Sequence, residues 1–152
     1  MPRSEFLLGL VIALHIGVYF AGMILLEVGP QRTLALPLLD TVTQAVLFSL
    51  VLVFMQLKDR IVQSLTAVFG ADVLLNLLSI PLALMSSASI DSAAGSLPAL
   101  AAIVVLLWSL GVKGHILQRA TGFPYFVGVV IALGFYIAVL MIDNSLFGSQ
   151  NG

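Results

Sequence analysis

The residues with the greatest capacity for chemistry are a few polar side chains inside long apolar segments of this 152-residue chain. His15 and Asp72 each stand near the middle of such a segment, Gln44 stands at a similar depth in another, and Asn76 follows Asp72 by one helical turn. Polar and ionisable side chains are costly inside a bilayer and mark ion or proton pathways. We therefore predict an intramembrane polar cluster of His15, Gln44, Asp72 and Asn76.

Two roles are open to this cluster. An aspartate beside a histidine can pass protons, as ionisable residues do in pumps and transporters. Alternatively, the same groups form structural hydrogen bonds between helices, worth about 0.6 kcal/mol each on average. We favour the structural role, because transporters usually have more spans and one acid with one histidine is a small constellation.

No set of residues indicates catalysis. The chain lacks a GxSxG sequence and any cysteine, so the usual nucleophile patterns are absent. An aspartyl dyad requires two carboxylates at one depth, and the only other candidate, Asp40, is expected near the outer face, well away from Asp72. We therefore predict that the protein is not an enzyme.

A metal or haem site is also not expected. The two histidines, His15 and His115, fall in different segments at different depths, and no HxxxH or HExxH spacing occurs. Bis-histidine haem ligation needs a pair at matched depth. The prediction is no metal and no cofactor.

The composition indicates what holds the polar residues. Hydrophobic residues make up 61% of the chain and charged residues 9%, against roughly 45–50% and about 25% in soluble domains. A spanning helix needs about 20 mostly apolar residues. Five such runs predict an all-α polytopic transmembrane bundle that forms a single domain over residues 1–152, with spans at about 6–26, 34–57, 61–85, 97–117 and 123–142.

Prolines help to place the helices. Pro37, Pro98 and Pro124 each lie near a predicted helix start, where the missing N–H has little consequence. Pro81 falls inside the third span and predicts a kink there. The longest loop is expected at residues 86–96.

Basic residues predict the orientation. With five spans, one side of the membrane receives five basic residues and the other receives only Arg32. The positive-inside rule then places the N-terminus in the cytoplasm and the C-terminus outside, in a bacterial-type inner membrane. The five residues on the cytoplasmic side are Arg3, Lys58, Arg60, Lys113 and Arg119.

Four of these, Lys58, Arg60, Lys113 and Arg119, form with His115 a modest positive rim at the predicted interface. Such a rim could hold anionic lipid headgroups, although we favour ordinary topology signalling. The charge is too sparse for nucleic-acid binding, since the net charge is −1.

A stripe of small residues on the first span predicts close helix packing. Gly9, Ala13, Gly17 and Ala21 recur every four residues, a spacing that lets another helix approach closely. His15 lies on the opposite face, because two residues turn a helix by about 200°. Both faces are thus expected to pack against other helices. This favours a membrane-protein partner or a homo-oligomer, although a central position of this span in a five-helix bundle would also satisfy both faces. On the fifth span, Gly128/Ala132 and Gly134/Ala138 repeat the spacing more weakly.

The stretch Trp108–Met141 carries a tryptophan in an aliphatic helix, a short basic loop and a helix rich in glycine and aromatic residues. With the five-span topology, it resembles the closing hairpin of bacterial Yip1-type membrane domains. That resemblance implies a membrane-organising or adaptor protein without enzymatic residues. The characteristic polar and tyrosine motifs of the eukaryotic members are missing here.

The sequence thus predicts a non-enzymatic accessory, scaffold or assembly subunit of a larger inner-membrane complex, with the lipid bilayer and another membrane protein as partners. The alternative is a small proton-coupled transporter or channel centred on Asp72 and His15.

Overall fold

The computed structural model describes residues 5–88 and 96–148. Within these ranges the regular secondary structure is all helical, with no β-strand. The elements are α1 (Glu5–Leu25), α2 (Pro30–Phe54), a 3-10 turn η1 (Lys58–Arg60), α3 (Ile61–Ala88), α4 (Ser96–Thr121) and α5 (Tyr125–Phe147).

All five long helices have the length and apolar character needed to cross a bilayer. Large apolar side chains are exposed along every one of them, for example Leu14, Leu50, Leu74, Val104 and Ile137. Water would disfavour so much exposed apolar surface, whereas lipid tails do not. The prediction of an all-α chain with five apolar, span-length helices is confirmed.

The second helix begins earlier than predicted. It starts at Pro30, because proline suits the first turn of a helix, where an N–H has no partner to bond. Pro37 therefore lies inside α2 and not near its start, and the expectation for Pro37 was wrong. The Thr41 hydroxyl donates to the Pro37 carbonyl at 2.6 Å. α3 continues through Pro81 to Ala88, and most of the loop predicted at residues 86–96 lies outside the described residues.

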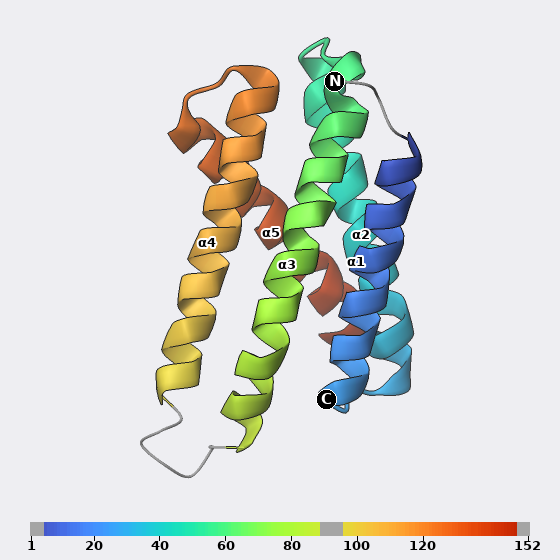
Figure 1. Ribbon diagram of the computed structural model, residues 1–152, viewed down its shortest axis with the longest axis vertical. Coiled ribbons are helices and arrows are strands. Elements are labelled where there is room, and N and C mark those ends of the chain that lie inside the picture. Colours follow the sequence, from blue (N-terminus) through green and yellow to red (C-terminus); the bar gives the residue numbers. More distant parts are fainter. Residues whose placement is uncertain (1–4, 89–95, 149–152) are drawn as a thin grey trace.

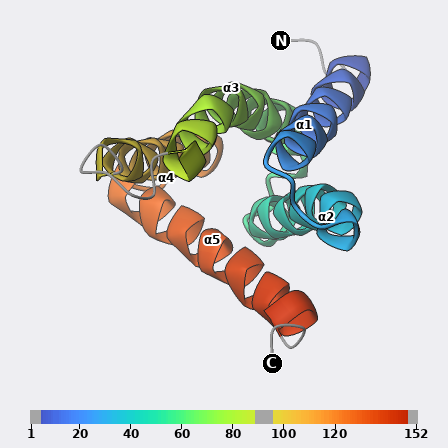
Figure 2. The ribbon, with the colours of Figure 1, turned by 90° about the horizontal axis from the view of Figure 1, so that it is seen from below.

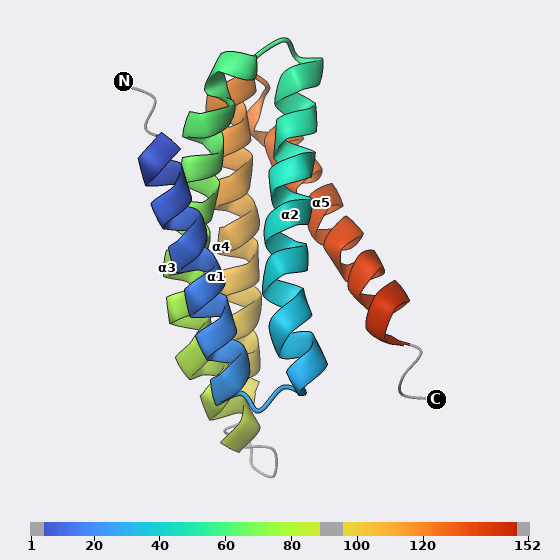
Figure 3. The same ribbon diagram turned by 90° about the vertical axis from the view of Figure 1, so that its right-hand side faces the viewer.

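Consecutive helices run in opposite directions, so α1 and α3 run the same way. Figure 1 shows α3 between α1 and α4, and both pairs are in contact. Seen from below, α5 starts beside α4 and runs obliquely past α2 (Figure 2). The side view shows the same tilt of α5 away from the other four helices (Figure 3).

The tightly packed core lies in one half of the bundle, toward η1. Phe48 of α2 packs there with Val68 and Phe69 of α3 and with Leu117 of α4, and all four side chains are fully buried. The Phe48 ring lies 5.1 Å from the ring of Phe135, which packs the middle of α5 against the core. The other half of the bundle has fewer buried apolar side chains.

α4 and α5 approach each other closely where they cross, at Gly114 and Gly128. Both residues are buried. A Cβ atom built on Gly128 would collide with the carbonyl oxygen of Gly114, and one on Gly114 would lie 2.8 Å from the backbone nitrogen of Val129. Backbone meets backbone here, so only glycine fits.

Replacing Gly128 with alanine should therefore push α4 and α5 apart. Overpacking of this kind costs about 1–3 kcal/mol, and we expect a lower melting temperature, measured by circular dichroism on the detergent-solubilised protein. Gly134→Ala on the same helix is the matched control, because a Cβ at that exposed position meets nothing within 4 Å. Equal melting temperatures for the two variants would contradict the close crossing.

Candidate functional site

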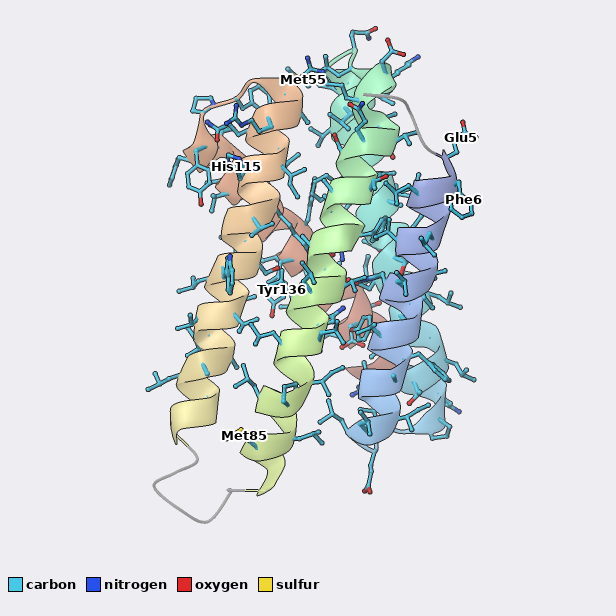
Figure 4. All side chains as sticks on the ribbon, in the orientation of Figure 1. Glu5, Phe6, Met55, Met85, His115 and Tyr136 are labelled. Atoms are coloured by element: carbon cyan, nitrogen blue, oxygen red, sulfur yellow. The ribbon has the colours of Figure 1, made fainter. Side chains whose placement is uncertain are left out.

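A cavity of about 710 Å³ lies among the helices in the half of the bundle away from the packed core. Residues from all five helices line it. The polar ones are His15, Tyr19, Asp40, Gln44, Asp72, Asn76, Ser79, Ser109, Lys113 and Tyr136. Tyr136 of α5 lies at mid-height of the bundle, where Figure 4 shows it between the α3 and α4 ribbons. A smaller cavity of about 280 Å³ shares six of these residues and adds Asp143.

An ion pair joins α3 to α4 across the cavity. The Nζ atom of Lys113 lies 3.1 Å from Oδ1 of Asp72, and the lysine side chain is only 16% exposed. The prediction that Lys113 belongs to the interfacial rim was wrong. α4 continues to Thr121, which places Lys113 eight residues, or about 12 Å, from the helix end. Its ammonium group turns to the buried carboxylate instead of to the headgroups.

A second contact joins α1 to α2. The Nε2 atom of His15 lies 3.3 Å from Oδ2 of Asp40, and the Gln44 amide donates to the same oxygen at 2.8 Å. His15 is 1% exposed, and its ring packs against Phe69 with 5.2 Å between centroids. The His15 contact has the distance of an ion pair but not the alignment of a hydrogen bond.

Asp40 was expected near the outer face, well away from Asp72, and this was wrong. Because α2 begins at Pro30, Asp40 stands ten residues inside the helix, four more than the predicted start allowed. That adds about 6 Å of depth. Asp40 and Asp72 line the same cavity.

The four residues of the predicted polar cluster, His15, Gln44, Asp72 and Asn76, all line this cavity. Asp72 and Asn76 share a face of α3, since they are four residues apart. The contacts between helices, however, go through Asp40 and Lys113, which the sequence prediction did not include in the cluster. The sequence could have placed Asp40 in the cluster, because Asp40 lies one helical turn before Gln44 and the two share a helix face.

Several buried polar atoms in this region make no hydrogen bond within the described part of the protein. They are both ring nitrogens of His15, Oε1 of Gln44, Oδ2 of Asp72 and Oδ1 of Asp143. Buried polar groups in folded proteins are nearly always bonded to protein or to ordered water. These residues line the cavities, so hydrogen-bond partners can reach them there.

The remaining rim residues lie at the η1 end of the bundle. Arg60 donates to the carbonyls of Arg119 at 3.2 Å and Ala120 at 2.9 Å. These are among the last carbonyls of α4, so the guanidinium caps the negative end of the helix dipole. Lys58 and Arg119 are exposed. His115 lies at the same end as Met55 and opposite Met85 (Figure 4).

The small-residue stripe of α1 faces outward. Gly9, Ala13, Gly17 and Ala21 are all exposed, and a Cβ atom at Gly9 or Gly17 would meet nothing within 4 Å. No helix of the described chain covers this face, while His15 on the opposite face is buried. On α5, the Gly128 and Ala132 positions are buried and Gly134 is exposed.

Within residues 5–88 and 96–148, no three His, Asp or Glu side chains come together in a way that could hold a metal ion. The side chains that line the cavity offer charge, hydrogen bonding and proton exchange.

The Asp72–Lys113 ion pair should affect the thermal stability of the protein. Lys113→Met leaves a buried carboxylate without its cation, and breaking a buried pair in this way costs about 3–5 kcal/mol. Replacing both partners, as in Asp72→Leu with Lys113→Met, removes both buried charges and often restores stability. We expect the double variant to melt at a higher temperature than Lys113→Met alone. If the stability lost in the double variant equals the sum of the losses in the two single variants, the two side chains do not interact.

Comparison with known proteins gives no relative: the chain matches no protein-family model, no curated protein and no solved structure. What the protein does has to be inferred from the cavity itself.

Proposed function

We propose that this protein is a non-enzymatic carrier that moves a small polar solute across the membrane through its central cavity, coupled to proton movement. The observation that carries the proposal is the presence of two charged contacts, Asp72–Lys113 and His15–Asp40, in one cavity lined by all five helices. Charged groups within a bilayer are costly, and those that face a cavity mark substrate and ion pathways.

The residue types support proton coupling. Imidazole is the side chain that most readily changes charge between pH 5 and 8. His15 faces the Asp40 carboxylate at 3.3 Å, and a proton gained or lost by either group changes the net charge of the cavity. A solute that carries charge would respond to that change.

The position of the cavity supports a direction of access. Beyond its polar centre, the cavity continues along Leu82, Ala83 and Ala102, near the α3–α4 connection. The exposed basic residues Lys58 and Arg119 gather at the opposite end. With the N-terminus in the cytoplasm, as the basic residues favour, the cavity would lie nearer the outer face of a bacterial inner membrane.

Flux through the purified protein tests this function. Proteoliposomes would trap a pH-sensitive dye while gradients of small cationic, anionic and neutral solutes are imposed one at a time. We expect at least one class of solute to drive proton movement above that of protein-free liposomes. Asp72→Asn should reduce this movement at least tenfold, because it removes a buried charge of the pathway.

Glu27→Gln is the control for this assay, because Glu27 is exposed in the turn after α1, away from the cavity. It should leave the flux unchanged. If the wild-type protein moves no more protons than empty liposomes for any class of solute, the carrier function is wrong.

A scaffold or assembly subunit is the second candidate. The uncovered stripe of α1 supports it, because small residues at this spacing let a second transmembrane helix pack closely. The resemblance to Yip1-type membrane domains points in the same direction. The occupant of the stripe would be another membrane protein or a second copy of this chain.

Gly17→Leu separates the second candidate from the first. A leucine would fill the stripe at an exposed position, so it should reduce the recovery of membrane partners in native-detergent purification followed by mass spectrometry. Gly134→Leu, at an equally open position on α5, should not. Under the scaffold hypothesis Asp72→Asn leaves the partners in place. If Gly17→Leu recovers the same membrane partners as the wild type, the stripe no longer supports the scaffold function.

A further inference from the structure

The two adjoining cavities together have a surplus of acidic side chains. Asp40 and Asp72 line it, and Asp143 lines the adjoining cavity, whereas Lys113 is the only lysine or arginine among the lining residues. The ammonium group of Lys113 is bound to one oxygen of Asp72. Asp40 has contacts with a neutral amide and with His15, which carries a charge only when protonated. With all three carboxyl groups ionised, one negative charge over the two cavities together therefore remains unbalanced when His15 is protonated, and two when it is neutral.

The buried oxygen atoms without a hydrogen bond also favour a ligand that donates hydrogen bonds. Oδ2 of Asp72, Oε1 of Gln44 and Oδ1 of Asp143 are buried without a hydrogen-bond donor. Asp72 and Gln44 are each only 5% exposed. All three atoms are acceptors. A ligand that satisfies the two in the larger cavity, on Asp72 and Gln44, has to bring N–H or O–H donors. A positively charged donor forms the stronger bond with a carboxylate.

The rest of the wall is apolar. Toward the α3–α4 end, the lining beyond Ser79 consists of aliphatic side chains: Leu82, Ala83, Ala102, Val105 and Leu106. In the polar centre, Tyr19 and Tyr136 add aromatic rings, whose faces attract cations. The cavity thus has an acidic, aromatic centre and an aliphatic extension.

From this arrangement we infer that the solute is an amphipathic organic cation, with a primary ammonium group bound at the Asp72–Gln44–Asp40 centre and an apolar body along α3 and α4. The inference rests on the proposed carrier function and names the class of its substrate. An anion would meet the surplus carboxylates. A bare metal ion would find no group of three acidic or histidine ligands in the described chain, and it would leave the aliphatic extension without a role.

Three compounds of matched size and different charge test the inference. They are 2-phenylethylammonium, 2-phenylethanol and 3-phenylpropanoate, titrated calorimetrically into the full-length protein in lipid nanodiscs, with empty nanodiscs to subtract partition into lipid. We expect the ammonium compound to bind at least tenfold more tightly than the alcohol and the carboxylate to bind more weakly still. Equal binding of the three, or a preference for the carboxylate, would overturn the inference.

Variants locate the binding in the cavity. Asp72→Asn and Asp40→Asn should each weaken binding of the ammonium compound at least tenfold, because each removes a carboxylate from the centre. Asp72→Asn also leaves Lys113 without its partner, so its fold needs to be checked by circular dichroism. Asp143→Asn, which disturbs no ion pair in the described structure, should weaken binding as well, by a smaller factor. Glu27→Gln should bind as the wild type does. Unchanged binding in all three cavity variants would contradict the site.

The two assays fail in different ways. If solute gradients drive proton flux but the neutral alcohol binds as well as the ammonium compound, the carrier function stands and the cationic substrate is wrong. If the ammonium compound binds selectively but no gradient moves protons, the cavity is a cation site and the carrier function is wrong.

Discussion

The rest of this structure depends on one constraint: a charge between apolar, span-length helices is costly unless another helix provides its partner. Asp72 of α3 meets Lys113 of α4, and Asp40 of α2 meets His15 of α1. These contacts fix which faces of four helices turn inward. They also keep polar groups together in one place, and the cavity forms around that place.

One half of the bundle is tightly packed with apolar side chains, and the other half holds the cavity with its charged side chains. Near η1, large apolar side chains such as Phe48 and Phe69 fill the space between helices, and α4 and α5 touch through Gly114 and Gly128. From that crossing α5 tilts away from its neighbours (Figures 2 and 3). Helices that meet closely at one end and diverge toward the other leave room between them, and the charged side chains line that room. The packed half supplies the rigidity that a positioned charge pair needs.

The number and type of helices could be predicted from the sequence because hydropathy is a local property. The contents of the site could be predicted only in part, because depth depends on where a helix begins and ends. Taking α2 to begin near Leu34 placed Asp40 too close to the surface, and ending α4 near Leu117 placed Lys113 at the interface. The sequence also does not show how each helix is rotated about its axis. Small-residue spacing indicates that a helix can pack closely, but it does not show which helix packs against which. The regular stripe of α1 is exposed, whereas the weaker pattern at Gly128 marks a backbone contact.

The inferred ligand would act on the same interactions that hold the cavity together. An ammonium group presents to Asp72 and Asp40 the kind of charge that Lys113 and His15 already present. The ligand would use the acceptor atoms that the side chains leave unbonded, such as Oδ2 of Asp72, while Lys113 stays on Oδ1. The inferred centre takes Asp40 and Gln44 from α2 and Asp72 from α3, so a bound ammonium group would add a link between these two helices. A ligand that joins carboxylates of two helices thus has a physical means of linking occupancy to helix movement, because a ligand shifts a conformational equilibrium only through contacts that differ between the two states.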